Sequence, residues 1–124
     1  MADVILKKID EIEPYSGPRT IPGMRMRAAA RALGITAWGM SVFEIDPGIT
    51  GYPEHDHTRD GQEEAYVVLR GSGTIQAGDE KLEVTTGTMV RVGPGQKRTW
   101  LAGPDGIRVL AIGSTPGKAY EPRR

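Results

Sequence analysis

The sequence of 124 residues contains no cysteine at all. This absence excludes disulfide bonds, thiolate metal ligands and a cysteine nucleophile, and it suits a reducing compartment. Histidine is nearly as scarce, because the chain has only two. Any site that needs an imidazole, for a metal or for proton transfer, must therefore use one of these two residues.

The chain also lacks an excess of charge of either sign, since 16 Lys and Arg residues balance 16 Asp and Glu residues. A chain without net charge has no general field that would hold nucleic acid or an anionic membrane. No apolar run is long enough to span a bilayer or to form the core of a signal peptide. We therefore expect a soluble, cytoplasmic protein that binds neither nucleic acid nor membranes.

Glycine and proline are abundant, with 17 and 9 residues, and they favour tight turns between short strands. Segments rich in β-forming residues end at turn signals throughout the second part of the chain: 35–45, 64–70, 74–77, 81–85, 88–92, 97–102 and 107–113. We predict hairpins around residues 78–80 and 103–106, and a strand end at residues 71–73. Short strands at this spacing indicate an all-β sandwich or barrel.

The flanks of this core differ from it in composition. We predict one domain over residues 1–124, divided into an N-terminal arm at 1–34, a barrel at 35–113 and a C-terminal tail at 114–124. Within the arm, residues 24–34 are compatible with a short helix or with an extended chain. Arg25, Arg27 and Arg31 in this stretch are predicted to form a solvated basic face.

The two histidines, His55 and His57, are two residues apart. On an extended chain, side chains at i and i+2 point to the same face, so both imidazoles can serve one site. The same alternation places Glu64 and Tyr66 on one face of the next strand and Glu63 on the other. An inward carboxylate needs a metal ion, an arginine or a proton to balance it. The alternative is two solvated loop histidines and a strand-end carboxylate in water.

These residues resemble the first motif of the cupin family, in which a glycine precedes His-x-His, a glutamate and a second glycine. The matching residues of this chain are Gly48, His55, His57, Glu64 and Gly71. Six residues separate Glu64 from Gly71, as in the family, and this count selects Glu64 over Glu63. The loop between His57 and Glu64 is longer than the family pattern, which a barrel rim tolerates because the cost of loop closure grows slowly with length.

The resemblance implies a double-stranded β-helix, which is a jelly-roll barrel of antiparallel strands. It also implies that His55, His57 and Glu64 hold a divalent ion of iron, zinc, manganese or nickel. The second motif of the family supplies a further histidine, but this chain has Arg98 at that position. An arginine stays protonated and cannot ligate a metal.

Arg98 leaves three alternatives open. If its side chain turns aside, the three remaining ligands form a two-histidine, one-carboxylate metal site with open positions. If no metal binds, Arg98 pairs with Glu64 in place of the ion, or holds the carboxylate or phosphate of a ligand. In the third alternative, Arg98 faces solvent at the end of its strand. No catalytic residue is assigned.

We expect the barrel to bind a small molecule, and we predict that five side chains contact it: Arg98, Tyr66, Trp38, Met40 and Trp100. Core packing is the alternative role for the last four. The resemblance implies either a metal-dependent enzyme of the dioxygenase, isomerase or decarboxylase type, or a metal-free binding or sensing module that uses Arg98. It also implies a homodimer that pairs through an edge sheet or through an exchanged N-terminal arm, for which residues 1–13 are the candidate. Residues 4–6 and Ile9 are a candidate edge strand in this arm.

Overall fold

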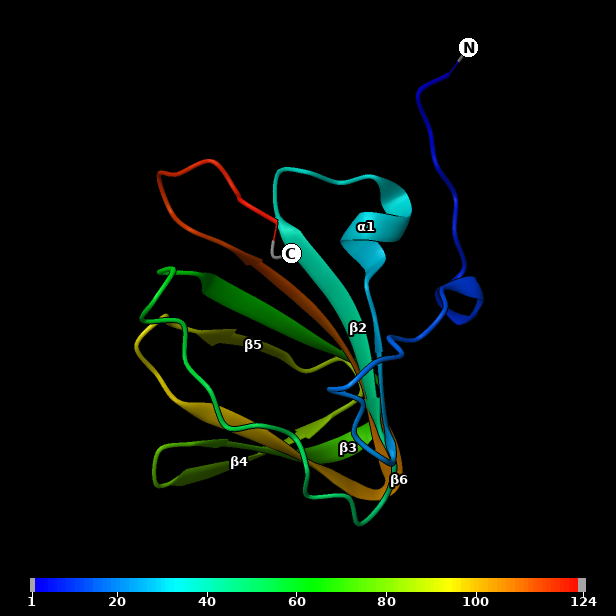
Figure 1. Ribbon diagram of the computed structural model, residues 1–124. Coiled ribbons are helices and arrows are strands. Elements are labelled where there is room, and N and C mark those ends of the chain that lie inside the picture. The colour runs from blue at the N-terminus through cyan, green and yellow to red at the C-terminus, as the bar shows by residue number, and fades with distance from the viewer. Residues whose placement is uncertain (1, 123–124) are drawn as a thin grey trace.

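The computed structural model describes residues 2–122 as a barrel of antiparallel strands (Figure 1). The first residue of the predicted arm and the last two of the predicted tail lie outside the described residues. The elements in chain order are the 3-10 helix η1 (Ile9–Glu11), β1 (Met24–Arg27), α1 (Ala29–Leu33), β2 (Gly39–Ile45), β3 (Glu63–Ala77), β4 (Glu80–Thr85), β5 (Met89–Val92) and β6 (Arg98–Ser114). The predicted all-β jelly-roll fold is confirmed.

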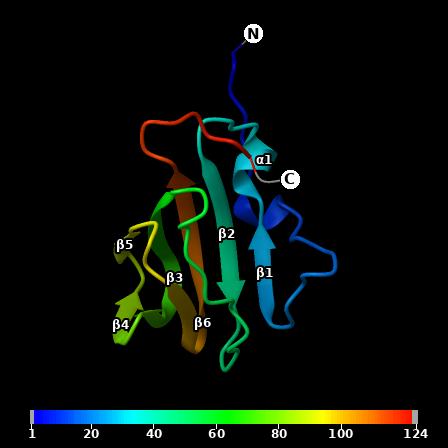
Figure 2. The ribbon, with the colours of Figure 1, turned by 60° about the vertical axis from the view of Figure 1, so that its left-hand side comes forward.

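Two long strands, β3 and β6, run through the whole barrel and pair with each other along their length. The sheet order is β1-β2-β6-β3-β4, and β5 pairs with the first half of β3. The first half of β3 and the second half of β6 form one layer with β1, β2 and β5, while their other halves form a second layer with β4. Figure 2 shows β1, β2, β6 and β3 side by side.

Two predicted turns are wrong, because the chain bends at these positions without leaving the sheet. β3 continues through residues 71–73 to Ala77, and residues 103–106 are a bend inside β6 instead of a hairpin loop. Gly71 and Gly106 have φ angles of 85° and 76°, and a Cβ atom on Gly71 would lie 2.1 Å from the oxygen of Gly106. These glycines let the two backbones approach closely, so both strands bend from one layer into the other.

The boundaries of other strands agree more closely with those predicted from the sequence. The β3–β4 hairpin and the strand β5 are confirmed, whereas β2 begins at Gly39 and not at residue 35. Residues 24–34 contain both of the conformations considered for them, since β1 pairs with β2 and α1 follows it and ends at Gly34. Within residues 2–122, no helix combines the length and the apolar character needed to cross a membrane.

Alternate residues of the two layers line the interior of the barrel. The buried core includes Phe43, Ile45, Tyr66, Val68, Ile75, Trp100 and Val109. Glu64 alternates in step with Tyr66 and Val68, so its side chain lies on this inner face. Glu44 lies between the inward-facing Phe43 and Ile45, so its side chain lies on the outer face of the sheet.

The N-terminal segment lies against the outer face before it reaches β1. A backbone hydrogen bond of 2.7 Å from Tyr15 N to Met26 O attaches it to the edge of the sheet. Val4, Ile5 and Leu6 belong to no strand and are 68%, 53% and 86% exposed. Figure 1 shows this end of the chain projecting away from the barrel. The candidate edge strand therefore does not form within one chain, and the homodimer stays a prediction.

Candidate metal centre

The segment that carries the two histidines lies against the start of β6. His55 and Arg98 form a bridge, with hydrogen bonds of 3.1 Å from His55 N to Arg98 O and 3.0 Å from Arg98 N to His55 O. The amide of His57 donates to Pro94 O at 2.8 Å. These backbone contacts hold the segment extended, so that both imidazoles point to the same side, as the i, i+2 spacing predicts.

The carboxylate of Glu64 is the centre of the cluster. Its Oε1 atom lies 3.1 Å from His57 Nε2 and 3.9 Å from His55 Nε2. The ligand atoms of the three residues all lie within 4.8 Å of one another. The structure therefore brings together the three residues predicted as metal ligands, close enough to share one ion.

The second ring nitrogen of each histidine lies beside an acceptor of its own. His55 Nδ1 is 3.1 Å from Pro53 O, and His57 Nδ1 is 3.1 Å and 3.3 Å from the carboxylate oxygens of Asp60. A proton on Nδ1 satisfies these oxygens and leaves the lone pair on Nε2, which is the tautomer of a metal-binding histidine. His57 Nε2 then faces the Glu64 oxygen, and two acceptors at this distance require a proton or a cation between them.

Burial and hydrogen bonding act in opposite directions on Glu64. Burial alone would raise the pKa of Glu64, but the imidazoles of His55 and His57 and the hydroxyl of Tyr66 outweigh it and lower the pKa well below its ordinary range. The contact with Glu64 in turn raises the pKa of His57. Glu64 is therefore ionised at neutral pH, and His57 readily carries a compensating proton.

Arg98 lies inside this cluster and not at the surface. Its side chain is completely buried, and Nη2 donates to Glu64 Oε1 at 2.9 Å. Nη1 donates to Gln96 O at 2.7 Å, and Nε donates to the hydroxyl of Tyr66 at 3.3 Å. That hydroxyl donates to the same Glu64 oxygen at 2.6 Å. The structure thus favours the pairing of Arg98 with Glu64 over the solvent-facing alternative, and it leaves the guanidinium closed to a ligand.

The donor set of His55, His57 and Glu64 fits a divalent metal ion. Two imidazole nitrogens and one carboxylate suit iron, zinc, manganese or nickel, and the Nδ1 contacts hold the rings in the orientation that such an ion requires. Arg98 opposes binding, since a divalent ion and a guanidinium 4 Å apart repel by about 8 kcal/mol at an effective dielectric of about 20. The negative charge of Glu64 beside both cations offsets part of this repulsion. The residues therefore fit an ion, with an affinity that Arg98 lowers.

The other predicted ligand contacts are divided between the interior and the surface. Tyr66 and Trp100 lie inside the barrel, with ring centroids 5.1 Å apart. Trp38 precedes β2 and is 41% exposed. Met40 pairs with Ile112 and lies on the outer face, because it is in step with Glu44 and out of step with the inward-facing residues of β2. Of these four side chains, only Tyr66 and Trp100 lie within the barrel.

The sequence analysis missed Tyr52, whose ring packs against the cluster. Its ring centroid lies 5.9 Å from that of His55 and 5.2 Å from that of Phe43. Burial first, and then the charge of Glu64, raise the pKa of Tyr52 far above its ordinary value of 10.0. Its backbone oxygen accepts a hydrogen bond from Thr99 Oγ1 at 3.0 Å, which ties the segment before His55 to β6. Its only sequence signal is its place three residues before His55.

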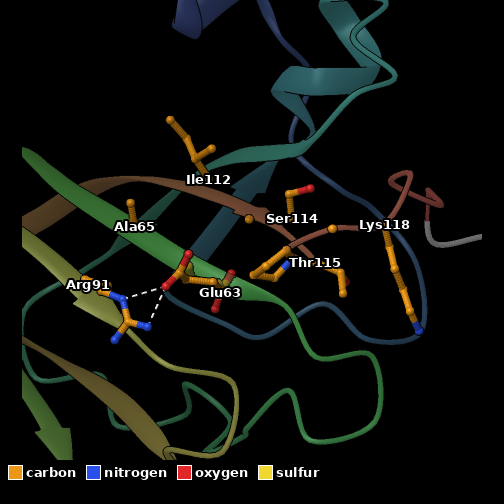
Figure 3. A pocket seen from close by; sticks show the side chains of 11 residues that line it. Glu63, Ala65, Arg91, Ile112, Ser114, Thr115 and Lys118 are labelled. Atoms are coloured by element: carbon orange, nitrogen blue, oxygen red, sulfur yellow. Dashed lines mark hydrogen bonds and ion pairs between the residues drawn. The ribbon is translucent and has the colours of Figure 1, made fainter.

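Glu63, the neighbour of Glu64, points away from the cluster. Its Oε2 atom accepts a hydrogen bond from Arg91 Nε at 2.7 Å and forms an ion pair with Arg91 Nη2 at 2.5 Å. The pair borders an open cleft of about 570 Å³ that Ala65 and Ile112 also line (Figure 3). The structure therefore places Glu64, and not Glu63, at the inner site, as the strand alternation and the motif count predict.

Comparisons with known proteins bear on the fold of this chain. The family model described as Cupin domain matches residues 41–113 of the chain. None of the curated proteins matches it. Among solved structures, a cupin protein from Bacteroides fragilis is similar, with a TM-score of 0.67 and 24% identity, over 91% of this chain and 92% of that one.

Two further similar structures are named for enzymatic activities. A sugar phosphate isomerase of the cupin superfamily from Silicibacter pomeroyi has a TM-score of 0.74 and 16% identity, over 86% of this chain and 73% of that one. A predicted oxalate decarboxylase from Thermotoga maritima has a TM-score of 0.72 and 19% identity, over 90% of this chain and 99% of that one. At these identities the likeness shows the fold alone.

Proposed function

The chain belongs to the cupin family, and from the geometry of its barrel we propose that it binds a small anionic molecule at a divalent metal ion held by His55, His57 and Glu64. The observation that carries this proposal is the gathering of two Nε2 atoms and one carboxylate oxygen within 4.8 Å, with each Nδ1 beside an acceptor. When bound, the ion supplies a Lewis acid with open positions for a ligand oxygen.

The charges of the cluster favour an anionic ligand. Arg98 and Glu64 balance each other, so a divalent ion leaves this buried site with an excess of positive charge. Asp60 is a further carboxylate in contact with the cluster, but it lies behind His57, at the ring nitrogen that faces away from Glu64. A carboxylate or phosphate group of the ligand supplies the missing negative charge. His55, whose side chain is 34% exposed, marks the side from which the ligand enters.

Several side chains prepare the ligand set. Tyr66 and Arg98 both donate to Glu64 Oε1 and keep this carboxylate oriented and ionised. The indole Nε1 of Trp100 is buried and has no hydrogen-bond partner among residues 2–122, so it is a donor for an oxygen atom inside the barrel. Two similar solved structures are named as a sugar phosphate isomerase and a predicted oxalate decarboxylase. A metal-dependent reaction of the dioxygenase, isomerase or decarboxylase type is the activity that we propose, on fold analogy.

Arg98 supports a second candidate function, a metal-free module that binds or senses a small molecule. Its guanidinium, 2.9 Å from Glu64 and completely buried, already supplies the positive charge that the carboxylate needs. In this case the Arg98–Glu64 pair replaces the ion as the centre of the barrel. The ligand then meets the exposed face of His55, since Arg98 has no exposed surface with which to hold it.

Metal binding by the untagged protein separates the two candidates. Isothermal titration with zinc, manganese or ferrous ions alone is expected to show one site per chain. Glu64→Gln is expected to weaken this binding by about a hundredfold or more. Loss of a side chain that only supports a metal ligand already costs up to about a hundredfold in affinity, and Glu64 is itself a proposed ligand. Glu63→Gln is the matched control, because it makes the same chemical change on the adjacent residue that faces the opposite side.

Arg98→His adds the missing fourth ligand and removes the opposing charge, and it is expected to tighten metal binding strongly. If the wild-type protein binds none of these ions, or if Glu63→Gln weakens binding as much as Glu64→Gln, the metal proposal is wrong. The metal-free module is then the favoured function. The change in metal affinity of Arg98→His shows whether residue 98 occupies the ligand position.

A further inference from the structure

A row of four charged residues crosses the outer face of the sheet, on the side away from the candidate metal centre. Arg25 of β1 pairs with Glu44 of β2, Glu44 pairs with Arg108 of β6, and Arg108 pairs with Arg70 of β3. Directly paired residues point to the same side of a sheet, so three guanidiniums and one carboxylate share this row. Arg70 and Arg108 are like charges in direct opposition, an arrangement that is unfavourable without an anion between them.

Glu44 satisfies only part of this positive charge. Its Oε1 atom accepts hydrogen bonds from Arg25 Nε at 3.2 Å and from Arg27 Nε at 3.1 Å. Its Oε2 atom accepts from Arg108 Nε at 2.8 Å and from Arg108 Nη2 at 2.5 Å. Arg70 Nη2 is left 3.7 Å from the same oxygen, and its side chain is 69% exposed. The oxygens of Glu44 are thus saturated by three arginines. Asp46 accepts a further hydrogen bond from Arg25 Nη2 at 2.9 Å, whereas Arg70 keeps most of its donors for another acceptor.

Asp10, from the N-terminal segment, supplies a second carboxylate at this position. Its Oδ1 atom accepts a hydrogen bond of 2.5 Å from Arg108 Nη2, while its side chain is 74% exposed. This hydrogen bond, with the charges of Arg108, Arg27 and Arg70, lowers the pKa of Asp10. The positive potential of the row therefore reaches the place where the Asp10 carboxylate lies.

The segment that carries Asp10 is weakly packed. The 3-10 helix η1, to which Asp10 belongs, contains no buried residue. Two backbone contacts hold the chain after it, with Ile12 O accepting from Arg27 Nη1 at 2.7 Å and Tyr15 N donating to Met26 O at 2.7 Å. These contacts do not involve the Asp10 side chain. The carboxylate can therefore leave Arg108 while the rest of the segment stays attached.

We propose that Arg70 and Arg108 form a binding site for a small oxyanion on the outer face of the barrel, and that the Asp10 carboxylate occupies this site as an intramolecular competitor. Two guanidiniums on adjacent strands offer the paired donors that carboxylate and phosphate groups prefer. Arg27 of β1, on the far side of β2, adds positive charge, whereas Arg25 is paired with Asp46. The site is separate from the metal centre proposed above, because it lies on the opposite face of the sheet and shares no residue with it.

Asp10→Asn tests this proposal, because it removes the competing charge and keeps the size of the side chain. Binding of inorganic phosphate is measured by isothermal titration, with chloride added to constant ionic strength. The variant is expected to bind phosphate roughly tenfold more tightly than the wild-type protein, since an attached competitor acts at a high effective concentration. The double variant Asp10→Asn, Arg70→Gln is expected to lose this gain.

Asp79→Asn is the matched control, since it makes the same charge change in the exposed turn between β3 and β4. A general effect of net charge would tighten phosphate binding equally in Asp79→Asn and Asp10→Asn, and that result would overturn the proposal. Retention of the gain in the double variant would also overturn it, because phosphate would then bind without Arg70. Melting curves of all variants show whether the barrel stays folded during the titrations.

Discussion

Two glutamates with little exposed surface, on opposite faces of the same sheet, have different chemical surroundings. Glu64 faces the interior with its side chain 13% exposed, and Glu44 faces outwards with its side chain 6% exposed. The partners of Glu64 are one arginine, a tyrosine and two histidines, whereas every partner of Glu44 is an arginine. Imidazoles lose protons and offer lone pairs, but guanidiniums do neither. The partners of a buried carboxylate, more than its burial, therefore decide whether it can hold a metal.

The largest expected effect comes from Glu44→Gln. The neutral amide leaves Arg27 and Arg108, each 11% exposed, next to each other without their common counter-ion. Breaking a buried ion pair in this way costs about 3–5 kcal/mol of unfolding free energy. Urea unfolding measures the loss, with Glu80→Gln on the exposed strand β4 as the control for the chemical change. A loss below about 1 kcal/mol, as for a surface ion pair, would contradict the structural role given to Glu44.

A smaller effect is expected from Arg98→Met at the inner site. Methionine fills much of the volume, and Glu64 keeps the hydrogen bond from Tyr66 and the contact with His57, whose raised pKa allows it to carry the balancing proton. We expect a loss of about 2 kcal/mol, the size of one hydrogen bond to a charged group.

The response to zinc distinguishes the inner site around Glu64 from the arginine cluster around Glu44. Zinc is expected to restore stability to Arg98→Met, because the variant lacks the charge that opposes the ion. Zinc is expected to stabilise Glu44→Gln only as much as it stabilises the wild-type protein, because the metal centre is unchanged in this variant and Arg98 still opposes the ion. Urea unfolding with and without zinc measures both responses. Equal stabilisation of the two variants by zinc would contradict the opposing role given to Arg98.

The smallest expected effect is a pH dependence that belongs to Glu44. Burial alone would raise the pKa of Glu44, but hydrogen bonds from Arg108 and Arg27 outweigh it and hold the pKa below its ordinary value of 4.5. A carboxylate with a lowered pKa in the folded state contributes stability above the pKa of the unfolded chain. This contribution is lost as the pH falls below about 4.5 and through the folded pKa. Unfolding free energies between pH 3 and pH 6 should therefore fall more steeply in the wild-type protein than in Glu44→Gln.

The inner site could be predicted from the sequence because its residues lie close together in one regular pattern. His55, His57 and Glu64 follow strand alternation and a known spacing, and the structure brings them together. The charged row on the outer face could not be predicted in this way. Arg25 and Arg27 were expected in solvent, yet Arg27 is 9% exposed and bonded to Glu44. The partner lies on another strand, and local sequence does not show which strands become neighbours.

The sequence by itself determined the all-β fold, the β3–β4 hairpin and the inward direction of Glu64, because alternation and turn residues act over a few positions. Only the tertiary structure decided that β3 and β6 bend at their glycines instead of ending, since this depends on the close approach of Gly71 to Gly106. It also decided that Arg98 turns inward to Glu64 and does not face solvent. A guanidinium on a long side chain takes the position of its best counter-ion, and the fold alone places that carboxylate within reach.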